Sequence, residues 1–135
     1  MKSAVLTGCT GIVGKALIQE LISNDIEVLA ILRNKEYAGQ LEVFGVKTIL
    51  CTLDELDNIF LENKYDVFYH LAWDGTRGTS RLDENRQKKN VEYTMSAIRL
   101  AKRLGCKKFV GVGSQAEYGQ VPKNTKLSWN LLPNP

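Results

Sequence analysis

The stretch TGCTGIVG, residues 7–14, decides the fold of this chain. It overlaps the end of the apolar run Ser3–Thr7 and leads into Ile12–Ser23, where apolar residues recur at helical spacing. Its glycines are spaced G-x-x-G-x-x-G. In a strand-to-helix turn, such glycines permit the turn itself, a close backbone approach to a pyrophosphate, and packing of helix against strand. The stretch therefore predicts a turn whose backbone amides bind a diphosphate at a helix N-terminus.

Short apolar runs and helical patterns alternate along the rest of the chain. The run IEVLAIL, residues 26–32, is hydrophobic almost throughout, as is typical of a strand buried on both faces of a parallel sheet. A long helical pattern covers residues 85–104, with Gly105 placed to cap its end. Further strands are predicted at residues 47–50, 67–71 and 109–112. The alternation predicts an α/β fold of Rossmann type, a doubly wound parallel sheet with helices on both faces.

Two smaller patterns complete the expected architecture. Within residues 85–104, one apolar side of the helix is expected, and it comprises Val91, Met95, Ile98, Ala101 and Leu104. The segment 122–135 contains the three prolines of the chain and is expected to be irregular. No linker divides the chain, so one domain is expected.

The composition excludes several classes of protein. A length of 135 residues, 44% of them hydrophobic and 24% charged, suits one globular domain with its own core. The net charge of +3 is too weak to indicate nucleic acid binding, and no apolar stretch is long enough to span a bilayer. Three cysteines without a Cys-x-x-Cys pair, and one histidine, argue against a metal site. Free thiols indicate a reducing compartment, so we expect a cytoplasmic protein.

Four segments, in order, carry a resemblance to a known family. The turn at residues 7–14 is similar to T-G-x-x-G-x-x-G, and residues 69–73 (YHLAW) are similar to a fourth-strand H-L-A-A segment. Residues 90–94 resemble N-V-x-G-T, with Tyr93 in place of glycine. Residues 107–119 resemble K-R-F-V followed by S-S-x-x-x-Y-G. By this set the chain resembles the N-terminal part of an NAD(P)-dependent epimerase/dehydratase of the extended short-chain dehydrogenase/reductase superfamily.

The resemblance implies a nicotinamide dinucleotide and the residues that would bind it. Where the family often has an aspartate near the adenine, after the third strand, this chain has Thr52, which offers a weaker hydrogen bond. The loop at residues 74–78 follows the fourth strand and can line the same site, or can equally be a plain surface loop. The implied cofactor-binding residues are Thr7, Gly8, Thr10, Gly11, Ile12, Val13, Gly14, Arg33, Asn34, Thr52, Leu53, Leu71, Ala72, Trp73 and Asn90.

The end of the second strand bears on the choice between NAD and NADP. An acid at this position usually binds the ribose hydroxyls of NAD. Here Arg33, Asn34 and Lys35 follow the strand, whereas Asp25 and Glu27 lie at its start. The Arg33 guanidinium can pair with a 2′-phosphate, although it can equally be a solvated loop cation. We therefore expect NADP or NAD, with NADP slightly favoured.

The resemblance implies a catalytic serine but not a complete catalytic set. Ser114, four residues before Tyr118, would hydrogen-bond the substrate oxygen on which charge develops. None of the five tyrosines is followed four residues later by the lysine of the Tyr-x-x-x-Lys pair that moves the proton in this superfamily. We therefore expect residues 1–135 to be an incomplete Rossmann domain, truncated before its substrate-binding part and inactive as given. His70, inside an apolar strand, is expected in the core.

Three functional hypotheses follow. Gln115 and Ala116 stand where dehydratases of the superfamily carry an Asp-Glu pair, so dehydration is not expected. The first hypothesis is the cofactor-binding portion of a sugar-nucleotide epimerase or reductase. The others are a reductase of a non-sugar carbonyl compound and a non-catalytic module that senses NADP. The resemblance also implies a homodimer of the full-length form through two helices per subunit, of which the helix at residues 85–104 is one. It further implies a nucleotide sugar or other small carbonyl compound as substrate.

Overall fold

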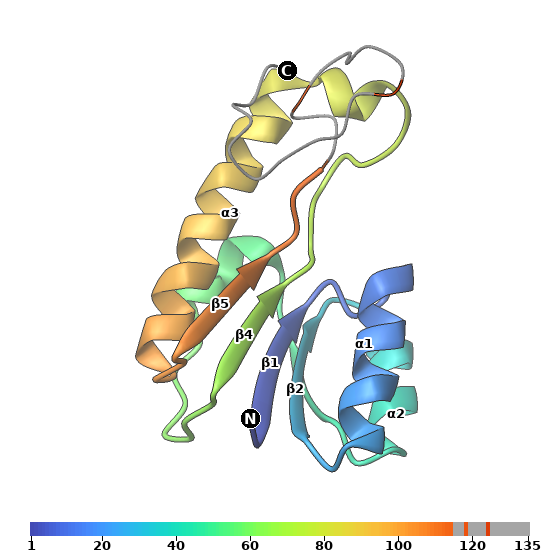
Figure 1. The fold of residues 1–135 in the computed structure, drawn as a ribbon. Coiled ribbons are helices and arrows are strands. Elements are labelled where there is room, and N and C mark those ends of the chain that lie inside the picture. Colours follow the sequence, from blue (N-terminus) through green and yellow to red (C-terminus); the bar gives the residue numbers. More distant parts are fainter. Residues whose placement is uncertain (115–117, 119–123, 125–135) are drawn as a thin grey trace.

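A computed structural model describes residues 1–114, 118 and 124 of the chain. Within these residues, five strands form one parallel sheet in the order β3-β2-β1-β4-β5 (Figure 1). In the register of the sheet, Val5 lies opposite Leu29 on one side and Phe68 on the other. The strands are β1 Ser3–Thr7, β2 Glu27–Leu32, β3 Lys47–Leu50, β4 Val67–His70 and β5 Lys108–Gly111.

Helices cover both faces of this sheet. In Figure 1, α1 and α2 lie on one face and α3 runs along the other. The helices are α1 Ile12–Ser23, α2 Lys35–Glu42 and α3 Glu84–Arg103, with short 3-10 helices η1 Leu53–Asn58 and η2 Gly78–Leu82. The predicted Rossmann-type, doubly wound parallel sheet is therefore confirmed. Among the described residues, no helix combines the length and the apolar character needed to cross a bilayer.

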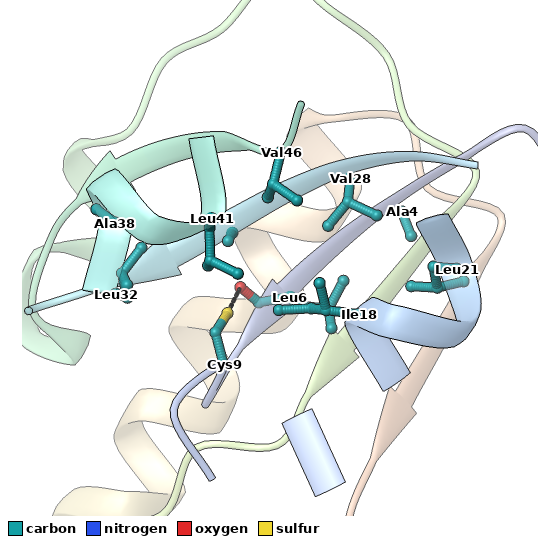
Figure 2. Packing of buried hydrophobic residues seen from close by; sticks show 11 residues of the cluster. Ala4, Leu6, Cys9, Ile18, Leu21, Val28, Leu32, Ala38, Leu41 and Val46 are labelled. Atoms are coloured by element: carbon teal, nitrogen blue, oxygen red, sulfur yellow. Dashed lines mark hydrogen bonds between the residues drawn. The ribbon is translucent and has the colours of Figure 1, made fainter. Parts of the chain in front are cut away.

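Side chains that alternate along the strands divide the core into two clusters. Ala4 and Leu6 of β1 face α1 and α2, whereas Val5 between them faces α3. Figure 2 shows the first cluster, in which Ile18 of α1 and Leu41 of α2 lie over β1 and β2. Because both faces are covered, the central strands are apolar at nearly every position, as predicted for residues 26–32.

The 3-10 helix η1 is tied to α3 by charged hydrogen bonds. The Asp57 carboxylate accepts from Arg99 at 2.6 Å and from the Ser96 hydroxyl at 2.8 Å, and these bonds hold the Asp57 pKa well below its usual range. Arg103 donates to the backbone carbonyls of Leu56, Asp57 and Ile59. The loop after β3 therefore has a fixed place beside α3.

The expected element boundaries hold to within one residue, but three short helices were not predicted. The helix α2 buries only Ala38 and Leu41, which is too weak a pattern to read in the sequence. It begins where the Asn34 side chain accepts a hydrogen bond from the Tyr37 amide at 2.8 Å. Gly105 ends α3 with φ +71°, as predicted. The expectation for residues 122–135 falls outside the described residues, apart from Asn124.

The expected apolar side of α3 is wrong over its first half. Val91, Met95 and Ile98 are 60%, 49% and 40% exposed. Ala101 and Leu104 are buried as expected, but the other buried residues of the helix are Asn90, Ala97 and Leu100. Ala97, Leu100 and Ala101 of the helix are the residues that join the core cluster on this face of the sheet. The apolar residues outnumber the buried positions, so spacing alone did not determine the rotation of the helix.

Candidate functional site

A cavity of about 650 Å³ opens at the carboxyl edge of the sheet. Because the carboxyl ends of parallel strands share one edge, the loops that follow β1, β2, β3 and β4 meet there. Tyr93 of α3 adds a side wall. The described lining residues are 8–11, 31–34, 51–54, 71–74, 76 and 93. The structure thus brings together Gly8, Thr10, Gly11, Arg33, Asn34, Thr52, Leu53, Leu71, Ala72 and Trp73 of the residues expected to bind a cofactor.

The three glycines of the turn differ in how much space the surrounding chain leaves for a side chain. A Cβ at Gly8, whose φ is +78°, would lie 2.5 Å from the Leu71 carbonyl carbon. A Cβ at Gly14 would lie 2.3 Å from the Gly8 carbonyl oxygen. At Gly11, by contrast, the nearest atom would be that same oxygen, at an ordinary 3.4 Å. Packing of the chain therefore requires glycine at 8 and 14 but not at 11, which is exposed and lines the cavity.

The N-terminus of α1 lies directly at this turn. Gly11 is the N-cap and has no side chain to accept a hydrogen bond from the first amides of the helix. No acidic residue lies in the first turn of α1. The unpaired amides and the partial positive charge of the helix therefore suit an anion bound in the cavity beside Gly11.

At the end of β2, the chain presents a cation and no acid. Arg33 is exposed and lines the cavity, and Asn34 lines it while its side chain caps α2. Asp25 precedes β2 and Glu27 begins it, so both lie at the amino edge of the sheet. Glu27 accepts from Lys47 at 2.6 Å there. This edge of the cavity therefore complements negative charge.

At the end of β3, the chain itself uses the hydroxyl of Thr52. That hydroxyl donates to the Glu55 carboxylate at 2.7 Å, and the Thr52 amide donates to the same carboxylate at 3.0 Å. Both hydrogen bonds lower the pKa of the Glu55 carboxyl, and the one donated by the Thr52 amide has the larger effect. Asp54 lines the cavity next to them and accepts from the Tyr93 hydroxyl at 3.0 Å. Because its proton is bound to Glu55, the Thr52 hydroxyl cannot donate a hydrogen bond to a nucleobase in this arrangement of the described residues.

At the end of β4, α3 holds the loop in place. The Asn90 side chain, 1% exposed, accepts from the Asp74 amide and donates to the Asp74 carbonyl, both at 2.8 Å. The Trp73 indole nitrogen donates to Gln87 at 2.9 Å. Asn90 is not among the described residues that line the cavity. Its side chain positions the loop that does, and of that loop Asp74 and Thr76 line the cavity as expected.

Thr7 and His70 form a buried pair beneath the cavity. The Thr7 hydroxyl and His70 Nδ1 lie 2.8 Å apart, and the imidazole stacks on Phe109. His70 Nε2 has no hydrogen-bond partner among the described residues. Burial lowers the His70 pKa, which keeps the ring neutral. The expectation of a core histidine is confirmed, and the side chain of Thr7 is directed to His70.

The remaining expected residues surround the cavity without lining it in the described part of the chain. Gly14 packs under the turn, and Ile12 and Val13 are exposed on the first turn of α1. Ser114 is exposed three residues beyond the end of β5. Sequence reasoning gave no role to Asp54 or Tyr93. The only signal for Tyr93 was its departure from the glycine of N-V-x-G-T.

The cysteines of the cavity do not supply reactive thiols. Cys9 is buried under the turn, where its thiol donates to the Leu6 carbonyl at 3.4 Å (Figure 2). Burial raises the pKa of Cys9 to about 12 and that of Cys51 to about 11. Both are therefore protonated at neutral pH. Among the described residues, no cluster of histidine, cysteine, aspartate or glutamate could hold a metal ion.

The fold of this chain is found in several solved structures. UDP-glucose 4-epimerase of Thermotoga maritima with UDP-glucose superimposes with a TM-score of 0.80 at 18% identity, over 98% of this chain and 45% of that one. MoeE5 in complex with UDP-glucose and NAD gives 0.78 at 20% identity, over 98% and 42%. UDP-glucose 4-epimerase of Bifidobacterium longum with NAD⁺ and UDP gives 0.79 at 20% identity, over 98% and 42%. This chain thus spans less than half the length of these proteins.

Sequence comparison adds the family. No curated protein matches the chain. Residues 4–132 match the family model described as NAD dependent epimerase/dehydratase family, which covers nearly the whole sequence. The chain therefore belongs to the NAD dependent epimerase/dehydratase family.

Proposed function

We propose that this chain is the cofactor-binding portion of an NAD(P)-dependent enzyme that transfers hydride at a carbon of a sugar nucleotide, as an epimerase or a reductase. One observation carries the proposal. Gly11 lines the cavity at the start of α1, and the packing of the chain gives no reason for a glycine there. A diphosphate that binds close to the backbone would explain the glycine at position 11.

The residues around the cavity suit the parts of a dinucleotide. The amides of the turn at residues 8–14 would bind the diphosphate, and the two nucleosides would lie over β2 and β3 and over β4 and β5. When bound, the nicotinamide supplies the acceptor or donor of a hydride. Asn90 positions the loop after β4, and Trp73 of that loop lines the cavity. Ser114, beyond β5 at the same edge, would hydrogen-bond the substrate oxygen.

Similar structures support the choice of a sugar nucleotide. MoeE5 is complexed with UDP-glucose and NAD, and also with UDP-glucuronic acid and NAD. Because the Tyr-x-x-x-Lys pair is not found in these 135 residues, we propose binding for the chain itself. Turnover is proposed only for a protein that also supplies that pair. Reduction of a non-sugar carbonyl compound and non-catalytic sensing of NADP are alternatives that the same binding site would serve.

Titration calorimetry of the chain with NAD and NADP tests the proposal. We expect dissociation constants in the micromolar range, about −8 kcal/mol. A chain that binds neither dinucleotide at millimolar concentration overturns the proposal. UDP-glucose added to the dinucleotide complex then tests the substrate class, and a non-nucleotide sugar is the control.

A preference for NADP is the finer part of this proposal. Arg33 lines the cavity at the end of β2, where the guanidinium can pair with a 2′-phosphate. Replacement of Arg33 by alanine is expected to weaken NADP binding about tenfold and to leave NAD binding unchanged. Lys107→Ala, at the amino edge of the sheet, is the control. Tighter binding of NAD than of NADP by the unaltered chain contradicts the preference.

A homodimer of the full-length form is also proposed. Val91, Met95 and Ile98 form an exposed apolar strip at i, i+4 and i+7 of α3. A strip of this kind suits a partner helix. Light scattering after size-exclusion chromatography tests it. Ile98→Glu should convert dimer to monomer, and a protein that is monomeric before any substitution refutes the dimer.

A further inference from the structure

Tyr93 and Asp54 form a side-chain pair in the wall of the cavity. The Tyr93 hydroxyl donates to Asp54 Oδ1 at 3.0 Å, across a separation of 39 residues in the sequence. Both residues line the cavity, Tyr93 half-buried and Asp54 exposed. The pair sits where η1 meets α3, a junction held by the bonds of Asp57 and Arg103. A flat ring and a carboxylate are therefore fixed side by side in this wall.

One oxygen of the Asp54 carboxylate remains available to a ligand. Oδ1 accepts the Tyr93 hydrogen bond, and Oδ2 accepts from no described residue. An ionised carboxylate offers about four lone-pair sites. Thr52, two residues after the end of β3, donates its hydroxyl proton to Glu55 and keeps only the lone pairs of a neutral oxygen. The charged Asp54 carboxylate is thus the stronger acceptor in this part of the wall.

The position of the pair identifies the part of a dinucleotide that it would meet. A dinucleotide bound at this edge would place the ribose of its adenosine half at the end of β2. The base, attached to that ribose, would then reach the neighbouring strand end, that of β3. The lining residues there are 51–54 together with Tyr93. The exocyclic amine of adenine is a hydrogen-bond donor, and every base has a face that stacks on an aromatic ring.

We propose that Tyr93 and Asp54 select the base of the dinucleotide. Asp54 Oδ2 accepts from the adenine amine, the Tyr93 ring packs against the base, and the hydrogen bond between the two residues fixes the carboxylate. The inference rests on the proposed function, because it assigns residues to one end of the same cavity. It assigns base recognition to a pair contributed by η1 and α3, rather than to Thr52 after β3.

The choice of ligand analogue gives a direct test. Nicotinamide hypoxanthine dinucleotide carries a carbonyl oxygen where NAD carries the amine, so an acceptor would face the Asp54 carboxylate. Titration calorimetry of the chain with both dinucleotides should show NAD bound about tenfold more tightly, as expected for a lost charged hydrogen bond. Asp54→Asn, whose amide can donate to the carbonyl, should bring the two affinities within about threefold of each other.

Variants of Tyr93 separate stacking from anchoring. Tyr93→Phe keeps the ring but frees the carboxylate, so the ratio of the two affinities should fall by about threefold. Tyr93→Leu removes the ring and should weaken both dinucleotides by about tenfold. Asp25→Asn makes the same chemical change at the amino edge of the sheet and should leave both affinities unchanged. Thermal unfolding of each variant checks that it is folded.

The outcomes distinguish this inference from the proposed function. If the unaltered chain binds neither dinucleotide, the proposed function fails. If it binds both equally, or if Asp54→Asn leaves the ratio unchanged in a folded protein, the Tyr93–Asp54 assignment fails while the cofactor site stands. A loss that is equal for both dinucleotides in Asp54→Asn also overturns the assignment, because a merely structural role would produce it.

Discussion

The cavity at the carboxyl edge has two walls that are built in different ways. At the glycine-rich turn the wall is backbone, and Gly8 and Gly14 are placed there because a side chain would collide with the chain. At α3 the wall consists of side chains that hold one another or the neighbouring loop. The hydrogen bonds that hold this wall, between α3 and the loops after β3 and β4, span 14 to 39 residues of sequence. The first wall therefore depends on local sequence, and the second depends on how α3 docks.

Alanine substitutions in the backbone wall should have the largest effect. In Gly14→Ala the Cβ would lie 2.3 Å from the Gly8 carbonyl oxygen. We expect the free energy of unfolding to fall by about 3 kcal/mol, as for severe overpacking. Gly11→Ala should change it by less than about 1 kcal/mol, yet weaken dinucleotide binding at least about tenfold. Urea denaturation and titration calorimetry measure the two quantities.

These two glycines are matched controls for each other. Equal destabilisation by Gly11→Ala and Gly14→Ala would mean that the whole turn serves packing alone. Full dinucleotide affinity in Gly11→Ala would remove the observation that carries the proposed function.

Asn90→Ala tests how the loop that carries part of the side-chain wall is held in place. The substitution removes two hydrogen bonds to the Asp74 backbone at a position that is 1% exposed. We expect the free energy of unfolding to fall by about 2 kcal/mol, because the Asp74 amide and carbonyl lose buried partners. Asn24→Ala, at the exposed end of α1, is the control and should cost less than about 1 kcal/mol. If Asn90→Ala lowered the free energy of unfolding by less than Asn24→Ala does, the loop after β4 would keep its conformation without Asn90.

The pH dependence of stability tests the buried pair of Thr7 and His70. Burial lowers the pKa of His70 in the folded state below its usual 6.5, so the unfolded chain binds a proton first as the pH falls. Stability should be retained above pH 6.5 and lost below it, by at most about 1.4 kcal/mol per pH unit. His70 is the one histidine of the chain, so His70→Gln should remove this part of the loss.

Urea denaturation at pH 7.5 and 5.5 provides the comparison between the chain and His70→Gln. Carboxylates contribute equally to both proteins. An identical loss in the two would mean that the imidazole is hydrated or charged in the folded state.

The smallest effect is expected on the outer side of α3. Met95 is 49% exposed, so Met95→Gln should change the free energy of unfolding by less than about 0.5 kcal/mol. The measurement is urea denaturation at a concentration at which light scattering shows a monomer. A loss above about 2 kcal/mol, typical of a core position, would mean that the helix is rotated toward the side first expected from its spacing.

The sequence by itself determined the sheet and the turn. The apolar runs 26–32 and Ser3–Thr7 are strands, and the glycine spacing identified the strand-to-helix turn, because these patterns act within a few residues. The short helices η1 and α2 escaped prediction, since they bury only one and two residues, respectively.

Only the tertiary structure decided which side of α3 faces the sheet and what that side does. Ala97 and Ala101 are small enough for close packing, and their burial turns Asn90 toward Asp74 while Val91 faces outward. The Tyr93–Asp54 contact arises in the same way. Such contacts join residues far apart in the chain, and their partners are set by the docking of whole elements rather than by local spacing.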